Sequence, residues 1–365
     1  MPDLVLALNA GSSTLKAGLF EAMPEGLIEL QRRTLEAPGP DSVADLLDWT
    51  QTAAPGGRLA GVGHRIVHGG LQFSAPVRLD PATLRALNDL SPLAPLHQPQ
   101  SLEAVRAVTA RRADLAQVAC FDTAFHRTQP PVAAWLGLTR ALHEKGVRRY
   151  GFHGLSYQYV SERIAVLDPD LAPRRLIFAH LGSGASLCAT LGGRSIETSM
   201  GFSPLDGLLM STRPGALDAG AVLHLISHEG MSPVEVEDLL YRGSGLLGVS
   251  GLSGDMRVLL ASKEAAAAAA VELFVHRALR EFGALAAVLG GLDGIVFTGG
   301  IGEHSAEIRA RIIGGLTWLG LELDPAANAR GGEGRISTAL SRVAAWVVPT
   351  DEELLIARQT FSLIG

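Results

Sequence analysis

Four short clusters in this chain combine arginine, histidine or aspartate with glycine, a mixture suited to binding a negatively charged group. Residues 63–70 read GHRIVHGG, residues 121–126 read FDTAFH, residues 148–154 read RRYGFHG and residues 211–215 read STRPG. The planar guanidinium of arginine binds carboxylates and phosphates through paired hydrogen bonds. Taken alone, each cluster is equally compatible with a purely structural role, because aspartates at strand ends often cap helices and histidines beside glycine are common in loops.

Residues 4–19, LVLALNAGSSTLKAGL, predict two strands joined by a tight polar turn, with Lys16 in the returning strand. Gly11 permits backbone angles and close approaches that other residues resist. Three hydroxyls, one amide and one ammonium can therefore face a polyanion. The pattern differs from the Walker loop, which needs GxxxxGK[ST] at the start of a helix. We expect a cradle for nucleotide phosphates; an ordinary polar hairpin is the alternative.

Two later segments extend this interpretation. Residues 175–191, RLIFAHLGSGASLCATL, repeat the plan of strand, Gly/Ser turn and strand, which suggests two similar halves. That plan resembles the actin-like ATPase superfamily, in which two hairpins hold the phosphates. Residues 294–304, GIVFTGGIGEH, end a buried strand in glycines, where ligands gather in α/β sheets. An adenine or ribose can rest on such bare backbone, although a tight turn into the next helix is the alternative.

The elements that position these clusters alternate between apolar strands and helices, as in an α/β protein. Strands are expected at residues 4–8, 15–20, 61–67, 116–121, 175–181, 185–190, 294–298 and 343–348. Helices are expected at residues 81–89, 101–112, 155–167, 216–227, 233–241, 263–289, 305–314 and 352–362.

Composition narrows the class of protein. The 365 residues are enough for two domains, and 47% hydrophobic with 19% charged residues is typical of a globular chain. A net charge of −6 without a basic block argues against nucleic acid as a partner. Cys120 and Cys188 lie in apolar runs, which predicts buried strand residues rather than a disulfide or metal site. No signal-peptide pattern or membrane-length apolar stretch is present, so we expect a cytoplasmic protein without a membrane partner.

Ten segments, taken in order, resemble the acetate kinases over nearly the whole chain. They are NAGSSTLK (9–16), GHRIVHGG (63–70), LAPLHQP (93–99), FDTAFH (121–126), RRYGFHG (148–154), HLGSGAS (180–186), SMGFSPLDGL (199–208), SGLLGVSGLSGD (244–255), FTGGIGE (297–303) and PTDEEL (349–354). The GHRxVHGG and FDTAFH motifs are specific to this family and its short-chain acyl kinase relatives. The resemblance implies the actin-like α/β fold, ATP or ADP with Mg²⁺ or Mn²⁺, a homodimer, and reversible phosphoryl transfer to a short carboxylate, usually acetate, giving acetyl phosphate.

The resemblance also implies two lobes. Residues 1–148 with 353–365 would carry the first hairpin and the acyl site, and residues 149–352 the second hairpin, the adenosine site and the dimer contacts. Asn9 and Glu352 correspond to the magnesium site. The family's nucleotide-binding positions correspond to Ser12, Thr14, Lys16, His180, Leu181, Gly182, Ser183, Gly184, Asp255, Met256, Arg257, Gly300, Ile301, Gly302, Glu303 and His304.

The acyl site follows from the same resemblance. Arg65 and Arg213 would hold the acyl substrate and the transferring phosphoryl group, and His153 would stabilise the transition state. The small apolar pocket for the methyl group corresponds to Val67, Leu96 and Pro204.

One family role is open to a physical objection. Asp122 is the family's acid–base residue, yet a short carboxylic acid, with a pKa near the value of about 4.3 for glutamic acid, is already ionised at neutral pH. The substrate therefore needs no base. We hypothesise that Asp122 instead orients Arg65 or a water bound to magnesium.

Several positions depart from the family pattern near the chemistry, and their effect on rate stays open: Leu155, Tyr157, Ser183, Pro214, Ala216 and His304. Two alternatives to acetate kinase remain. A propionate or butyrate kinase differs by added methylenes, each worth only about 1–3 kcal/mol in an apolar pocket. A non-catalytic nucleotide-binding homologue is disfavoured because the charged residues of the site are retained together.

Overall fold

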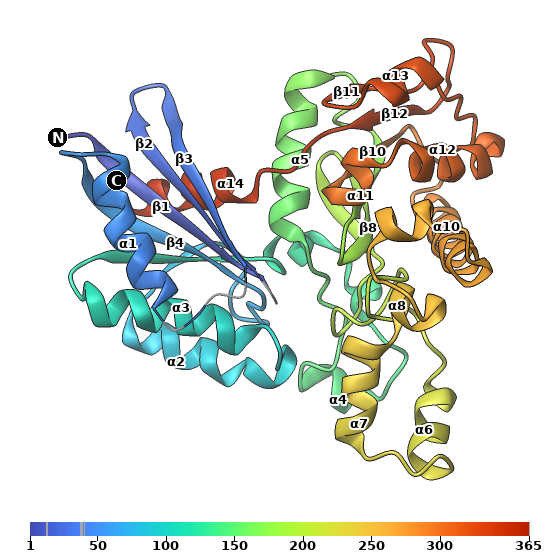
Figure 1. Ribbon diagram of the computed structural model, residues 1–365, viewed down its shortest axis with the longest axis horizontal. Coiled ribbons are helices and arrows are strands. Elements are labelled where there is room, and N and C mark those ends of the chain that lie inside the picture. Colours follow the sequence, from blue (N-terminus) through green and yellow to red (C-terminus); the bar gives the residue numbers. More distant parts are fainter. Residues whose placement is uncertain (12–13, 37–38, 40, 365) are drawn as a thin grey trace. The chain divides into compact units, whose positions relative to one another are not determined.

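The computed structural model describes residues 1–11, 14–36, 39 and 41–364, which form two compact α/β units (Figure 1). Within those ranges, unit 1 comprises Met1–Arg127, Gly154–Tyr159 and Asp351–Gly365, and unit 2 comprises Thr128–His153 and Val160–Thr350. The chain thus returns to unit 1 at Asp351, directly before its last helix. No described helix is long and apolar enough to cross a membrane.

Unit 1 is built on a six-stranded sheet in the order β3-β2-β1-β4-β6-β5. The strands are β1 (Asp3–Ala10), β2 (Thr14–Met23), β3 (Gly26–Glu36), β4 (Arg58–Ile66), β5 (Val77–Arg78) and β6 (Ala116–Phe121). β1 pairs antiparallel with β2 and parallel with β4, and β4 pairs parallel with β6. The carboxyl ends of β1, β4 and β6 therefore meet at one edge, which is where the polar clusters follow.

Alternation along β1 divides the core of unit 1 between two faces of the sheet. Leu4, Leu6 and Leu8 pack with helices α1 (Ser42–Ala53) and α3 (Gln98–Arg111). Val5 and Ala7 pack with α14 (Glu352–Ile364) on the other face. A strand exposes successive side chains to opposite faces, so this alternation fixes the register of the sheet. Helices cover both faces, as Figure 1 shows for α1 and α14.

Unit 2 repeats the same topology. Its sheet has the order β11-β12-β10-β7-β8-β9, made of β7 (Arg175–Leu181), β8 (Ala185–Leu191), β9 (Arg194–Thr198), β10 (Gly294–Thr298), β11 (Gly334–Arg335) and β12 (Ala344–Val347). β7 pairs antiparallel with β8 and parallel with β10, as β1 does with β2 and β4. The duplication suggested by the two Gly/Ser hairpins is confirmed, and with it the actin-like α/β fold.

The remaining helices are distributed over both units. The α-helices are α2 (Pro81–Asp89), α4 (Arg140–Glu144), α5 (Gly154–Leu167), α6 (Ala219–Ser227), α7 (Pro233–Asp238), α8 (Gly245–Ser250), α9 (Met256–Ala261), α10 (Ala265–Val288), α11 (Gly299–His304), α12 (Ala306–Gly315) and α13 (Pro325–Arg330). Short 3₁₀ or π turns are η1 (Ser91–Leu93), η2 (Ala124–Thr128), η3 (Pro131–Ala134), η4 (Leu239–Gly243) and η5 (Thr317–Leu319).

The predicted strands and helices are present, with ends shifted by a few residues, but several elements were missed. β3 was not predicted because it is a mostly exposed edge strand without clear apolar alternation. α1 was also missed, although Val43, Leu46 and Leu47 follow a helical period. The glycines after β10 form helix α11 rather than a simple turn.

Two buried histidines of unit 1, His64 and His68, lie near the carboxyl end of β4 and directly after it. His64 on β4 is 1% exposed and its Nε2 lies 2.8 Å from Gln117 Oε1, while the Gly70 N–H donates to His68 Nδ1 over 2.9 Å. Burial lowers the pKa of each histidine from 6.5 to about 4. Both side chains are therefore neutral at physiological pH.

These histidines make the fold sensitive to mild acid. The unfolded chain binds protons near pH 6.5, before the folded chain does, so stability falls as the pH drops from about 6.5 towards 4. For His64 alone we expect a loss of about 2 kcal/mol between pH 7.5 and pH 5. Urea unfolding at the two pH values measures this loss. His64→Gln should reduce the difference, whereas the exposed-site control His228→Gln should leave it unchanged. An equal difference in His64→Gln and wild type contradicts the assignment.

Candidate active site

Asn9, at the end of β1, joins the start of α14 in unit 1. Its Nδ2 donates to Glu352 Oε2 over 2.9 Å and to Glu353 Oε1 over 2.8 Å. Burial and the adjacent Glu352 raise the pKa of Glu353, while Asn9, Lys16 and Arg32 act in the opposite direction. Two neighbouring carboxylates beside an amide oxygen are a donor set that suits Mg²⁺ or Mn²⁺.

No group of three or more described His, Cys, Asp or Glu side chains forms a metal cage by itself. Magnesium is usually held by one or two carboxylates together with substrate phosphates and water, so Asn9 and Glu352 fit a metal that arrives with a nucleotide. Glu353 was missed as a site residue, although the adjacent glutamates of PTDEEL carried the signal.

The first phosphate hairpin is described except at its tip. Lys16 lies directly opposite Asn9 in the β1–β2 register, and the Gly11 N–H donates to Thr14 O over 2.8 Å. The turn therefore places the amide and the ammonium on paired strands. Ser12, predicted to contact the phosphates, lies outside the described residues.

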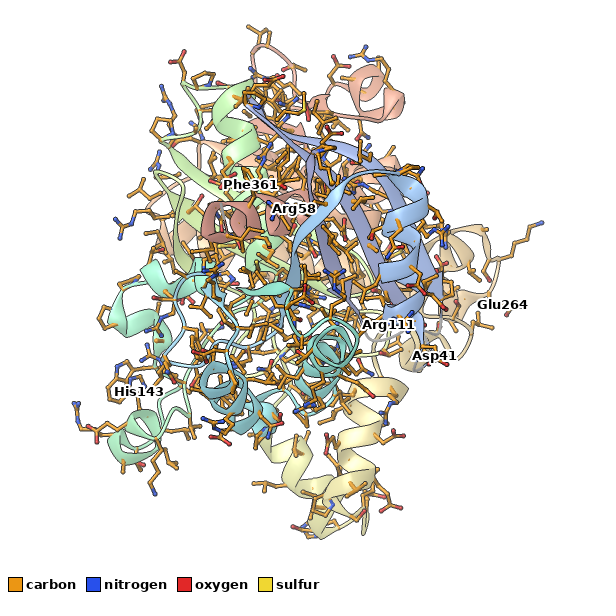
Figure 2. The ribbon with its side chains drawn as sticks, turned by 90° about the vertical axis from the view of Figure 1, so that its left-hand side faces the viewer. Asp41, Arg58, Arg111, His143, Glu264 and Phe361 are labelled. Atoms are coloured by element: carbon orange, nitrogen blue, oxygen red, sulfur yellow. The ribbon has the colours of Figure 1, made fainter. Side chains whose placement is uncertain are left out.

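Arg65 and Asp122 form a buried ion pair at the carboxyl edge of the unit 1 sheet. Arg65 Nε and Nη2 donate to Asp122 Oδ2 over 2.9 and 2.6 Å, and the two side chains are 16% and 1% exposed. They meet because β4 and β6 are parallel neighbours, with Arg65 opposite Cys120. By contrast, Arg58 opens β4 at its other end and pairs with Asp3 on the exposed surface (Figure 2).

This pair leaves one carboxylate oxygen available. Asp122 Oδ1 is buried and has no hydrogen-bond partner among the described residues. Burial raises the pKa of Asp122, and the Arg65 guanidinium opposes that shift. Arg65 Nη1 also lies 3.4 Å from Asn9 Oδ1, so the Asn9 amide and the arginine belong to one cluster.

His153, Arg213 and Gly184 converge in unit 2. The His153 ring stacks on His180 with centroids 4.3 Å apart, and its Nδ1 lies 2.9 Å from Ser186 Oγ. A Cβ at Gly184 would lie 2.8 Å from Arg213 Nη2 and 3.1 Å from His153 Nε2. Glycine at 184 therefore lets the arginine and the histidine approach the turn.

The backbone at His153 is unusual. Among the described residues it is the one non-glycine residue with a left-handed conformation, with φ of 60°. Such geometry costs free energy and clusters at functional sites. The left-handed backbone at His153 therefore indicates that the imidazole ring has a functional role at this position.

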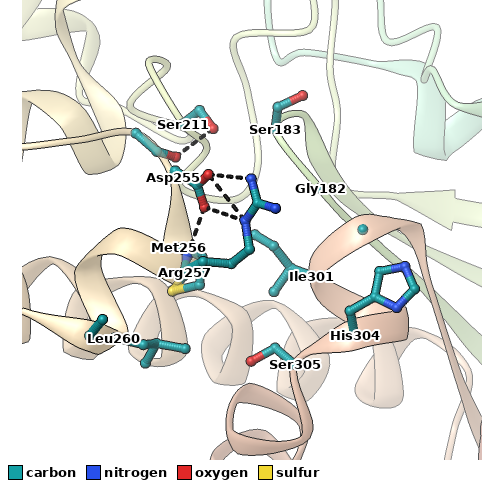
Figure 3. Close-up of a pocket in the computed structure, with 13 residues that line it drawn as sticks. Gly182, Ser183, Ser211, Asp255, Met256, Arg257, Leu260, Ile301, His304 and Ser305 are labelled. Atoms are coloured by element: carbon teal, nitrogen blue, oxygen red, sulfur yellow. Dashed lines mark hydrogen bonds and ion pairs between the residues drawn. The ribbon is translucent and has the colours of Figure 1, made fainter. Parts of the chain in front are cut away.

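A cavity of about 830 Å³ in unit 2 provides room for a nucleotide (Figure 3). The predicted residues that line it are Gly182, Ser183, Asp255, Met256, Arg257, Gly300, Ile301 and His304. The sequence analysis missed Ser211, Gly254, Leu260, Ala261 and Ser305, which complete the lining. Ser211 and Gly254 lie in two segments already singled out, STRPG and SGLLGVSGLSGD, whereas Leu260, Ala261 and Ser305 are uncharged and lie in none of these motifs.

Asp255 and Arg257 bind one another at the rim of this cavity. Arg257 Nη2 donates to Asp255 Oδ2 over 2.6 Å, and Asp255 also caps α9 through the Arg257 N–H. Figure 3 shows this pair opposite Ile301 and His304 on α11.

Some predicted nucleotide residues lie elsewhere in unit 2. His180, Leu181, Gly184, Gly302 and Glu303 do not line the cavity. Leu181 is buried in β7, His180 stacks on His153, and the Glu303 carboxylate accepts backbone hydrogen bonds. Their contacts with a nucleotide stay predictions.

The three residues predicted for the methyl pocket belong to different units, and their contact with a methyl group stays a prediction. Val67 and Leu96 belong to unit 1, where Val67 is 3% exposed and Leu96 is half-buried. Pro204 belongs to unit 2, and its carbonyl accepts from Arg213 Nη1 over 2.8 Å.

The duplicated sheets, the paired hairpins and the nucleotide-sized cavity define the actin-like class of ATP-dependent phosphotransferases. The chain belongs to the acetokinase family, whose model matches residues 39–358.

Its curated relatives agree over their full lengths. An acetate kinase from Rhodopseudomonas palustris is 50% identical, with 100% of this chain and 99% of the relative aligned. An acetate kinase from Nitrobacter hamburgensis is 47% identical over 99% and 96% of the two chains.

Solved structures show the same fold. A Porphyromonas gingivalis acetate kinase has a TM-score of 0.85 at 34% identity and covers both chains entirely. A Francisella tularensis propionate kinase has a TM-score of 0.88 at 35% identity, over 99% of this chain and 100% of that one.

The convergence at Gly184 can be tested by adding one methyl group. In Gly184→Ala the new Cβ must displace Arg213 or His153, and misplacing such groups by about 1 Å can cost on the order of 100-fold in rate. We expect phosphoryl transfer to fall by about 10- to 100-fold, measured as kcat, with the melting temperature little changed. The control Gly283→Ala adds a methyl where no atom lies within 4 Å apart from its chain neighbours and the backbone of its own helix, and it should retain full activity. Equal activities of the two variants refute a role for this convergence.

Proposed function

We propose that this chain is an acetate kinase that transfers the γ-phosphoryl group of ATP to acetate, reversibly, giving acetyl phosphate and ADP. The observation that carries the proposal is the Arg65–Asp122 ion pair beside the Asn9–Glu352 cluster, in a chain aligned end to end with acetate kinases. Phosphoryl transfer asks the protein mainly for alignment and charge neutralisation, which these groups supply.

Arg65 binds the acetate carboxylate or the transferring phosphoryl group, and Asp122 holds its guanidinium in one orientation. Both hydrogen bonds go to Asp122 Oδ2, so Oδ1 remains to accept from a water molecule at the reacting centre. Acetate reaches the site as an anion and needs no proton removed. In this proposal Asp122 is therefore a positioning residue rather than a base.

Arg213 and His153 serve the transferring phosphoryl group. With Ser186 Oγ donating to Nδ1, the His153 Nε2 carries a proton that it can donate to a phosphoryl oxygen. Arg213 supplies a fixed positive charge beside it. Val67, Leu96 and Pro204 are proposed to contact the methyl group.

ATP and ADP are proposed to occupy the unit 2 cavity, with Ser12, Thr14 and Lys16 reaching the phosphates. Asn9 and Glu352 hold Mg²⁺ or Mn²⁺. The metal, when bound, neutralises negative charge on the phosphates.

We include a homodimer and a cytoplasmic location in the proposal. α6 has an apolar sequence, yet none of its residues is buried. Leu223 in α6 is 64% exposed, and Val234 in α7 is 73% exposed. Exposed apolar surface of this kind supports a docking face for a second copy. The buried thiols Cys120 and Cys188 are compatible with a reducing compartment.

A propionate kinase is the second candidate, because a solved propionate kinase matches this fold over its whole length. The two activities differ by one methylene in the acyl pocket. That difference is worth about 1–3 kcal/mol, or about 10- to 200-fold in kcat/KM.

A hydroxamate assay with ATP and acetate, propionate or butyrate tests the proposal. We expect the highest kcat/KM with acetate, lower by about tenfold or more for each added methylene. A maximum at propionate or butyrate would favour the second candidate. No turnover with any acid, in protein that still binds ADP, would indicate a non-catalytic nucleotide-binding homologue.

A further inference from the structure

Glu303 lies in α11 among residues of the nucleotide cavity but has a different role. Gly300, Ile301 and His304 line that cavity and Glu303 does not. Its side chain is 14% exposed, and Oε1 accepts from the Gly299 N–H over 2.8 Å and from Thr298 Oγ over 3.3 Å. The same oxygen accepts from the Thr350 N–H over 3.2 Å. One carboxylate oxygen therefore joins two segments of unit 2 that are remote in sequence.

The first segment is the junction of β10 and α11, which presents bare backbone to the cavity. The carboxyl end of α11 is also held by hydrogen bonds. Arg309, 1% exposed, donates through Nη1 to the carbonyls of Gly302 and Glu303 over 2.9 and 2.8 Å. A cation at the last carbonyls of a helix stabilises its end. α11 is thus held at both ends by side-chain hydrogen bonds.

The second segment leads to the metal-site carboxylates. Thr350 is the last residue of unit 2, and Asp351 and Glu352 begin the return to unit 1. There the chain is held again. Arg32 donates to Asp351 Oδ2 and, over 3.3 Å, to Glu353 Oε2.

Each residue from 350 to 353 consequently has a defined anchor. Glu303 holds Thr350, Arg32 holds Asp351 and Glu353, and Asn9 holds Glu352. These four residues, which lead into the first turn of α14, are therefore hydrogen-bonded through backbone or side chain at every position. The nucleotide-facing helix is attached at the Thr350 end.

We propose that Glu303 is a positioning residue that couples nucleotide binding at α11 to the ordering of residues 350–353, which carry the metal-site Glu352. The inference rests on the proposed nucleotide site. A nucleotide that settles on Gly300 and Ile301 restrains α11, and Glu303 passes that restraint to the Thr350 amide. Two ligand-binding functions on separate segments then become linked through one carboxylate.

Hydrogen–deuterium exchange of the full chain, with and without saturating ADP and without metal, tests the coupling. In wild type we expect ADP to slow exchange in peptides covering residues 298–306 and residues 346–356. In Glu303→Ala the first protection should remain and the second should be lost. Glu303→Gln keeps an acceptor oxygen and should retain both. The control Glu307→Ala removes a half-exposed carboxylate that pairs with Arg311 and should also retain both.

Protection of residues 346–356 by ADP in Glu303→Ala, equal to that in wild type, overturns the inference, as does its absence in wild type. If Glu303→Ala does not bind ADP, Thr350→Pro decides the question, because it deletes the amide donor and leaves the Gly299 bond in place. That variant should bind ADP and lack the second protection; full protection overturns the inference. The assay needs no turnover. Failure of acyl transfer with the coupling intact would therefore contradict the proposed function alone.

Discussion

The buried ion pair of Arg65 and Asp122 is the constraint on which the site in unit 1 depends. A buried charge is costly unless it is paired and hydrogen-bonded, and here one aspartate oxygen accepts from both Nε and Nη2 of the guanidinium. The pairing holds the positive charge of Arg65 in one place and leaves the other aspartate oxygen without a partner among the described residues. Asn9, 3.4 Å from the same arginine, extends the cluster to Glu352 and Glu353. The charges of Arg65, Asp122, Glu352 and Glu353 therefore belong to one hydrogen-bonded group, which is where we propose that substrate and metal bind.

The duplicated topology explains why such groups form at these positions. In each sheet an antiparallel hairpin is followed by parallel strands, whose carboxyl ends share one edge. In unit 1 this edge presents Asn9, Arg65 and Asp122, and in unit 2 it presents His180 and α11. The same arrangement of strands thus places charged side chains at the edge in unit 1 and a glycine-rich helix start beside a cavity in unit 2.

The sequence predicted the buried strands and both hairpins, because alternation and glycine are local signals. Most of the cavity-lining residues were predicted from the resemblance to the acetate kinases instead. It did not predict β3, whose exposed residues blur its periodicity, and it did not predict α1, although Val43, Leu46 and Leu47 follow a helical period. It did not predict the hydrogen bonds of Glu353 with Asn9 or of Glu303 with Gly299 and Thr350, since the direction of a carboxylate depends on distant backbone. Two departures from the family pattern have a structural explanation: Leu155 and Tyr157 are buried in unit 1, Tyr157 against Phe125 and His126. Burial does not explain the departure at His304, because that side chain is 81% exposed at the cavity rim.

The pH dependence of kcat/KM for acetate, compared between wild type and Asp122→Asn, tests the account most directly. If Asp122 orients Arg65, the variant should lose about 10- to 100-fold at every pH from 6 to 8, because a charge-assisted pair is replaced by a weaker amide contact. The shape of its profile should match that of wild type. Arg65→Lys, which keeps the charge but not the planar fork, should behave in the same way. An acid limb that is present in wild type and absent in Asp122→Asn would show that Asp122 acts as a base. A near-normal rate with unchanged metal affinity would contradict the orienting role.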